Sequence, residues 1–184
     1  MMNARSGQKM YTRYPTWSVV LYDGLTVVHF LLGGSALLLG YPRQIGVPLG
    51  VAYVLFAFLE MFLLMPLTVC PSCVYYRIDG SLCISGLNRL SRRIARQRDG
   101  SRFGERARGL LCPNNLYLIA LVFPIVAVIP ALALSFSLLV LVALLVLVAL
   151  LVFRFFVVFP RIACVHCRAK NVCPNARSMG LSAT

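Results

Sequence analysis

The chain has 184 residues, 60% of them hydrophobic, with a net charge of +13 and seven cysteines. A soluble domain usually carries about 45–50% apolar residues, whereas the mean hydropathy here is +0.83, so the composition excludes an ordinary soluble domain and predicts a membrane protein. The basic residues flank the apolar runs, as is usual where charge sets membrane orientation, and we therefore do not expect nucleic acid as a partner.

The first two apolar runs predict a transmembrane hairpin. A basic N-terminal segment ending in Tyr14 and Trp17, residue types that favour membrane interfaces, precedes the run 18–40. This run is longer than the apolar part of a signal peptide, which is about 7–15 residues, so we expect a retained helix. A short turn leads to a second run of spanning length, 45–69. Residues 1–69 therefore predict a basic segment followed by two antiparallel helices.

The segment 70–115 is polar and contains nine arginines. Leu87, Leu90 and Ile94 recur at helical spacing, which predicts an amphipathic helix with a basic face. We expect this helix to bind lipids on the anionic membrane surface, or alternatively to pack its apolar face on the cysteine segments. The basic face consists of Arg89, Arg92, Arg93 and Arg96.

No charged residue occurs between residues 116 and 153, a stretch of 38 residues. As a single helix this stretch would be about 57 Å long, nearly twice the hydrocarbon thickness. We therefore predict a second hairpin over 116–160, with helices at about 116–134 and 137–159, and a short tail over 161–184. Arg154 is expected to reach back to the membrane surface with its long side chain.

The predicted fold class is an all-α integral membrane protein with four transmembrane helices in two hairpins. The N-terminus, the loop 70–115 and the tail are rich in arginine, whereas the two opposite turns hold only Arg43. The positive-inside rule then predicts that both termini and all the cysteines face the cytosol. The expected location is a prokaryotic cytoplasmic membrane, with the cysteines forming a cysteine-rich cytosolic face.

Six cysteines form two runs of the pattern Cys-x2-Cys-xn-Cys, and the seventh lies in the loop between them. Two thiolates on one turn can chelate the same metal, and a third nearby completes most of a tetrahedral set. In a reducing cytosol this pattern indicates metal binding or catalysis rather than a disulfide framework. The candidate ligands are Cys70, Cys73, Cys83, Cys112, Cys164, Cys167 and Cys173.

The spacing leaves the grouping and the cofactor open. Cys70, Cys73, Cys164 and Cys167 could share one site, or each run could form its own. In the second case Cys112 would complete the first site, and a group such as His166 or a partner's residue the second. The cofactor could be zinc or an iron–sulfur cluster, and the thiols could also be free or redox-active without metal.

Three ionisable residues fall within the apolar runs, where such groups are costly and point to function. These are Asp23, His29 and Glu60. His29 and Glu60 lie at depths that would let them approach each other across the first hairpin, as a quinone site, a proton relay or a cation path would need. The alternative is a protonated Glu60 that is hydrogen-bonded to a neighbouring helix or a partner subunit.

Three functions follow as hypotheses. The first is an accessory or docking subunit of a membrane complex, with a metal-ordered cytosolic face that binds a protein partner or a second copy. The second is a redox protein that passes electrons between a cluster or thiol pair and quinone, and the third is a proton or metal-cation transporter. The chain has no Walker, dinucleotide-binding, Gly-x-Ser-x-Gly or His-Glu-x2-His motif, so we do not expect an enzyme on its own.

Overall fold

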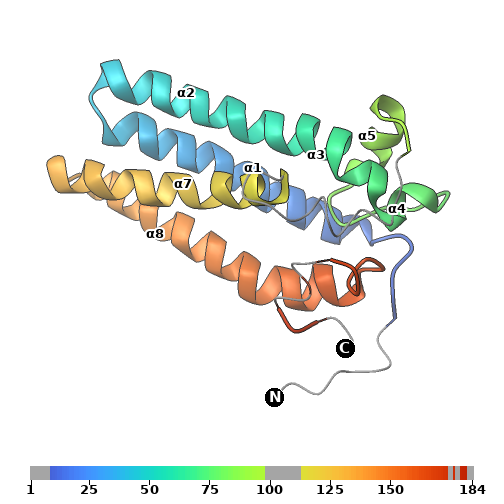
Figure 1. Cartoon of the computed structure of the whole chain (residues 1–184). Coiled ribbons are helices and arrows are strands. Elements are labelled where there is room, and N and C mark those ends of the chain that lie inside the picture. The colour runs from blue at the N-terminus through green and yellow to red at the C-terminus, as the bar shows by residue number, and fades with distance from the viewer. Residues whose placement is uncertain (1–8, 98–112, 174–175, 177–178, 182–184) are drawn as a thin grey trace.

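The computed structural model describes residues 9–97, 113–173, 176 and 179–181 (Figure 1). The described chain is helical, and its one β-type pairing is an isolated bridge between Arg13 and Leu82. Four helices are long and apolar enough to cross a membrane, which confirms the number of spans predicted. They cover Thr16–Gly40, Arg43–Ser72, Asn115–Leu134 and Leu138–His166.

The first two spans pack closely because small residues line their contact. Helix α1 (Thr16–Gly40) is joined to α2 (Arg43–Leu59) by a two-residue turn. A Cβ atom added to Gly50 would lie 2.7 Å from the carbonyl oxygen of Gly34, which leaves no room for a side chain there. Glycines at such positions let helix backbones approach within van der Waals contact.

The uncharged stretch forms two helices, α7 (Pro113–Leu134) and α8 (Leu138–Phe153), separated by the turn 135–137. Figure 1 shows α7 and α8 beside α1 and α2, with the two short turns at the same end of the molecule. Gly33 of α1 packs against Pro124 of α7, since a Cβ atom at Gly33 would lie 2.9 Å from that ring. Two helices thus replace the single long helix that the stretch could have formed, and α8 reaches spanning length with its continuation to His166.

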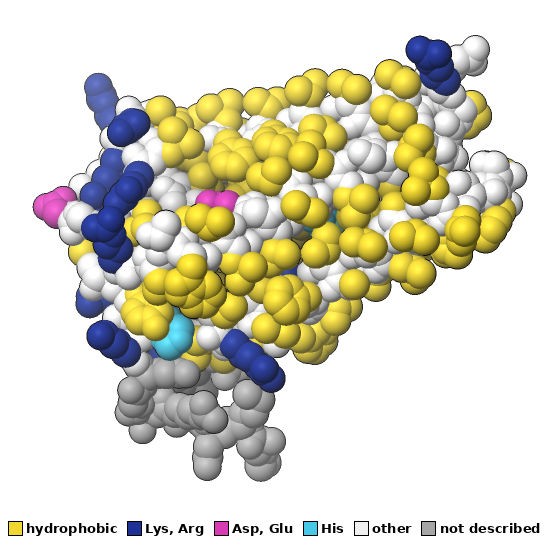
Figure 2. Space-filling view, turned by 180° about the vertical axis from the view of Figure 1, so that it is seen from behind, with side chains coloured by type: hydrophobic (Ala, Val, Ile, Leu, Met, Phe, Trp, Pro, Cys, Tyr) yellow, Lys and Arg dark blue, Asp and Glu magenta, His cyan; other side chains and the backbone are white. Residues whose placement is uncertain are grey.

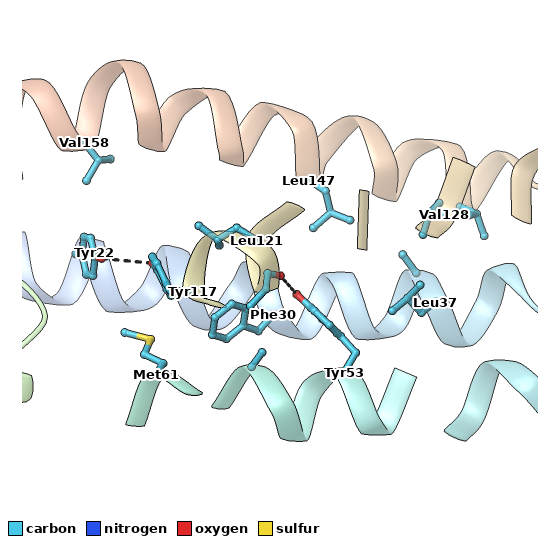
Figure 3. Packing of buried hydrophobic residues seen from close by; sticks show 14 of the residues in the cluster. Tyr22, Phe30, Leu37, Tyr53, Met61, Tyr117, Leu121, Val128, Leu147 and Val158 are labelled. Carbon is cyan, nitrogen blue, oxygen red and sulfur yellow. Dashed lines mark hydrogen bonds between the residues drawn. The ribbon is translucent and has the colours of Figure 1, made fainter. Parts of the chain in front are cut away.

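The core lies between the four spans (Figure 3). Phe30 and Tyr53 meet edge to face with ring centroids 6.5 Å apart, and the Tyr53 hydroxyl donates to the carbonyl of Ala120 at 2.8 Å. Leu121 and Leu147 close the core from α7 and α8. Outward-facing apolar side chains cover the flanks of the bundle (Figure 2), as expected of helices that lie in lipid.

Two of the spans change helical form before they end. Helix α2 continues as a π-helical segment, Glu60–Leu64, and then as α3 (Met65–Thr68). Helix α8 continues as a π-helical segment, Arg154–Ala163. Each span finishes in a short 3₁₀ turn that carries cysteine, Cys70–Ser72 in the first case and Cys164–His166 in the second.

The polar segment after Cys73 folds against the end of α3. It contains α4 (Val74–Arg77) and the predicted amphipathic helix, observed as α5 (Leu87–Ile94). Gly86, with a φ of +63°, turns the chain into α5, and the hydroxyl of Ser91 donates to the Pro66 carbonyl at 2.7 Å.

The four arginines predicted to lie on the membrane surface occupy two different environments. Arg92 turns inward, and its guanidinium donates to the carbonyls of Tyr75 and Tyr76 at 3.1 and 3.0 Å and to that of Ile78. This arginine therefore holds the loop that follows the first cysteine pair. The side chains of the other three are exposed: Arg89, Arg93 and Arg96.

Candidate functional site: a cysteine cluster beside a polar interior

The two Cys-x2-Cys motifs have the same local backbone geometry. In the first, the N–H of Cys73 donates to the carbonyl of Cys70 at 3.0 Å, and in the second the N–H of Cys167 donates to that of Cys164 at 3.2 Å. The second cysteine of each pair is extended, with φ, ψ of −77°, 148° and −76°, 130°. The backbone N–H two residues further on, from Tyr75 or Ala169, lowers the pKa of that cysteine and so acts against the effect of burial.

The two cysteine runs lie close enough for their thiols to interact electrostatically. Cys73 interacts with Cys83 in its own run and with Cys167 and Cys173 in the other. Cys167 in turn interacts with Cys173 and with Cys83. Chain segments about ninety residues apart in sequence thus bring their cysteines to one end of the bundle.

The N-terminal segment Lys9–Tyr14 lies between the two cysteine runs and bonds to both. The N–H of Tyr14 donates to the Leu82 carbonyl at 2.9 Å, beside Cys83. On its other side, the N–H of Tyr11 donates to the His166 carbonyl at 3.0 Å, and the Tyr14 hydroxyl donates to the carbonyl of Ala163. This segment fixes the two runs relative to each other.

His166 is one of the residues that hold the N-terminal segment in place. Its ring stacks on that of Tyr11 with centroids 4.4 Å apart, and its Nδ1 is hydrogen-bonded to the Lys9 carbonyl at 2.9 Å. The imidazole suggested from sequence as a possible ligand thus has a structural partner at Nδ1.

Burial favours the neutral form of the Cys73 and Cys167 thiols. It raises the pKa of Cys73 to about 12 and that of Cys167 to about 11, with the neighbouring cysteines adding to both shifts. Thiols must lose their protons before they bind a metal. Any metal bound at this site would therefore displace protons, and its affinity would rise with pH.

The described residues contain no group of three or more His, Cys, Asp or Glu side chains already arranged around a point where a metal ion could sit. The six cysteines in the described ranges carry free thiols, each half-buried. Cys112, suggested as a fourth ligand, lies outside the described residues. The thiols are thus neighbours that would have to converge to share an ion.

Below the cysteines, the interior of the bundle contains a buried arginine. Arg154 is 2% exposed; its guanidinium donates to the Thr26 hydroxyl at 2.7 Å and to the Tyr117 hydroxyl. It also lies 5.3 and 5.7 Å from the ring centroids of Tyr22 and Tyr117, a cation–π arrangement. The expectation that Arg154 reaches the membrane surface was wrong, because acceptors on α1 and α7 draw it inward.

The predicted approach of His29 to Glu60 does not take the form of a hydrogen bond. His29 Nε2 lies 2.9 Å from the Leu121 carbonyl, and because a carbonyl only accepts, Nε2 carries the proton. Glu60 is fully buried, and neither of its carboxyl oxygens has a hydrogen-bond partner among the residues described. Asp23 is half-buried with an unpartnered Oδ1, and its carboxyl and the His29 ring both interact with the charge of Arg154.

One relationship was missed by our reading of the sequence. Glu60 and Arg154 occupy the same position in a repeated pattern, a charged residue followed by x5-Pro-x3-Cys-x2-Cys. The prolines are Pro66 and Pro160, and each charged residue begins a π-helical segment. The fixed spacing of these few residues was the available signal, but comparison of the surrounding apolar residues obscured it.

The fold and this end of the bundle define a protein with four helices able to span a membrane, a polar interior and two repeated cysteine turns. Scans of family models, of curated proteins and of solved structures found no match for the chain.

Proposed function

We propose that this protein is an accessory membrane subunit whose two cysteine turns share one thiolate metal site, with zinc as the metal. The observation that supports it most is the pairing of two Cys-x2-Cys turns of equal geometry from the two halves of the chain, with thiols that interact across the halves. Zinc suits this donor set because it binds tetrahedrally to thiolates and carries no redox chemistry.

The backbone N–H groups beside each second cysteine support the same proposal. Those of Tyr75 and Ala169 lower the pKa of Cys73 and Cys167, which favours the thiolate over the thiol. The burial that opposes ionisation in the absence of metal also excludes water from a bound ion. A metal charge would reverse the local preference, since a coordinating thiol is deprotonated outright.

The proposed role of the metal is to order a docking face on the cytosolic side. This end contains few described residues beyond the spans, too few for a large core of its own, and structural zinc contributes folding free energy directly. Lysine and arginine side chains gather around this end (Figure 2), where they suit anionic lipid headgroups. A protein partner or a second copy of the chain would then bind the ordered face.

The test is the metal content of protein purified in mild detergent under reducing, anaerobic conditions, measured by mass spectrometry. We expect one zinc per chain, bound more tightly as pH rises. Cys73→Ser and Cys167→Ser should each remove all of the zinc if the site is shared. If the chain has two separate sites, the wild type should hold two zinc ions and each variant should lose one of them. Cys112→Ser is the matched control, because it should lower the content only if Cys112 is a ligand.

The same preparation decides between zinc and the redox alternative. If the protein is brown, contains iron and sulfide, and has an absorption that dithionite bleaches, the cofactor is an iron–sulfur cluster rather than zinc. That result would favour electron transfer to quinone as the function. A protein with neither metal would contradict the proposal and leave free thiols.

A further inference from the structure

From the geometry around Glu60 we infer an intramembrane proton-binding site, in which this carboxyl takes up and releases a proton inside the helix bundle. Glu60 is 0% exposed, and both of its carboxyl oxygens are buried without a hydrogen-bond partner in the described part of the chain. The inference is independent of the metal proposed at the cysteines.

The contrast with Arg154, at the equivalent position of the repeat, supports a neutral Glu60. The fold gives the permanently charged Arg154 two hydroxyl acceptors and two aromatic faces. From the residues that the structure describes, it gives Glu60 no hydrogen-bond donor. A buried carboxyl without donors or a counter-ion binds a proton rather than remain charged, so the missing partners of Glu60 mark the site as one for a proton.

The described elements around Glu60 supply no alternative partner for its carboxyl. Its segment packs against α2, α3 and α7, and the titratable or charged groups of these helices are Arg43, Tyr53 and Tyr117. Arg43 lies at the far end of α2, and the Tyr53 hydroxyl donates to the Ala120 carbonyl. The Tyr117 hydroxyl accepts from Arg154 and has the Thr26 hydroxyl as a second partner at 3.3 Å. On α1, His29 is bonded to Leu121 and Asp23 interacts with Arg154.

A metal cation fits this position poorly. Hard cations such as calcium and magnesium take several oxygen ligands, and Glu60 belongs to no group of three or more candidate ligand side chains among the described residues. The π-helical turn that begins at Glu60 is a rare form often found at functional sites. A single carboxyl on such a turn can bind a proton without any further ligand.

The test uses the apolar reagent dicyclohexylcarbodiimide on the full chain in lipid vesicles. The acidic proton of the carboxyl transfers to a carbodiimide nitrogen, and the carboxylate oxygen bonds to the central carbon. The adduct rearranges to an N-acylurea with no leaving group, so the peptide gains the whole reagent mass. We expect labelling at Glu60 that decreases as pH rises, none at that position in Glu60→Gln, and little label from a water-soluble carbodiimide, which should instead modify the exposed Asp79.

Infrared spectroscopy gives a second readout that does not depend on reagent access. Wild-type protein should show a protonated-carboxyl stretch that Glu60→Gln loses and that disappears reversibly at high pH. Absence of that stretch at every pH at which the protein is folded would overturn the inference, as would a stretch that never changes with pH. Zinc content should be unchanged in Glu60→Gln, so failure of this inference is distinguishable from failure of the metal site.

Discussion

A permanent charge inside an apolar bundle is stable only where the fold supplies hydrogen-bond acceptors, and Arg154 shows how few suffice. The Thr26 hydroxyl accepts one N–H while donating to the Tyr22 carbonyl at 2.8 Å. The Tyr117 hydroxyl accepts another, and its ring stacks against the guanidinium as well. Tyr117 therefore contributes both an acceptor and a π surface to the same cation.

Replacing Tyr117 by Phe should be more costly than replacing Tyr53 by Phe. Both changes delete one hydroxyl from a buried tyrosine, but the first leaves an N–H of a buried cation unpaired, which costs about 1–3 kcal/mol. The second leaves the neutral Ala120 carbonyl unpaired, because its helical donor would be Pro124, which has no N–H, and an unpaired neutral group costs less than an unpaired charge. Thermal unfolding in detergent should show the lower midpoint for Tyr117→Phe, and equal midpoints would refute the role given to its hydroxyl.

At the scale of the helices, contact between α1 and α2 depends on glycines that leave no space for a methyl group. A Cβ atom at Gly50 would lie 2.7 Å from a backbone oxygen of α1, whereas one at Gly24 would meet nothing within 4 Å. Since a backbone atom cannot swing aside as a side chain can, α1 and α2 would have to separate to admit it.

Gly50→Ala should therefore destabilise the protein, while Gly24→Ala should be neutral or slightly stabilising. Overpacking in a tight contact costs about 1–3 kcal/mol, and alanine in an unconstrained helix position is favoured over glycine by up to about 1 kcal/mol. Unfolding midpoints in the same detergent provide the measurement. A stabilised Gly50→Ala would mean that the two helices are not in the close contact described.

The helices were more predictable than the directions of their polar side chains. An uncharged run such as 116–153 fixes how many helices can fit in a bilayer, because its length is compared with a known thickness. It did not show in which direction the Arg154 side chain, just after α8, would point, because that direction depends on Thr26 and Tyr117 of other helices. The equivalence of Glu60 and Arg154 was readable from spacing alone, whereas their opposite surroundings were not.

For the whole molecule, the shared metal site requires that both cysteine runs lie on one side of the membrane. The N-terminal segment bonds to both runs, and the arginine-rich segments at this end are short enough for the positive-inside bias to act on them. The proposed orientation therefore places the N-terminus, both cysteine runs and the tail in the cytosol, with the turn 135–137 on the outside.

Single cysteine substitutions at exposed positions test this orientation with a membrane-impermeant maleimide, read site by site by mass spectrometry. Asp79→Cys reports on the first run and Val172→Cys, at a position 59% exposed, on the second, while Phe136→Cys, at one 74% exposed, reports on the opposite turn. We expect intact cells to label only Phe136→Cys and permeabilised cells to label all three, since an exposed new thiol reacts faster than the six half-buried cysteines of the described ranges. Labelling of Val172→Cys in intact cells, with Asp79→Cys protected, would place the two runs in different compartments and make a shared metal site impossible.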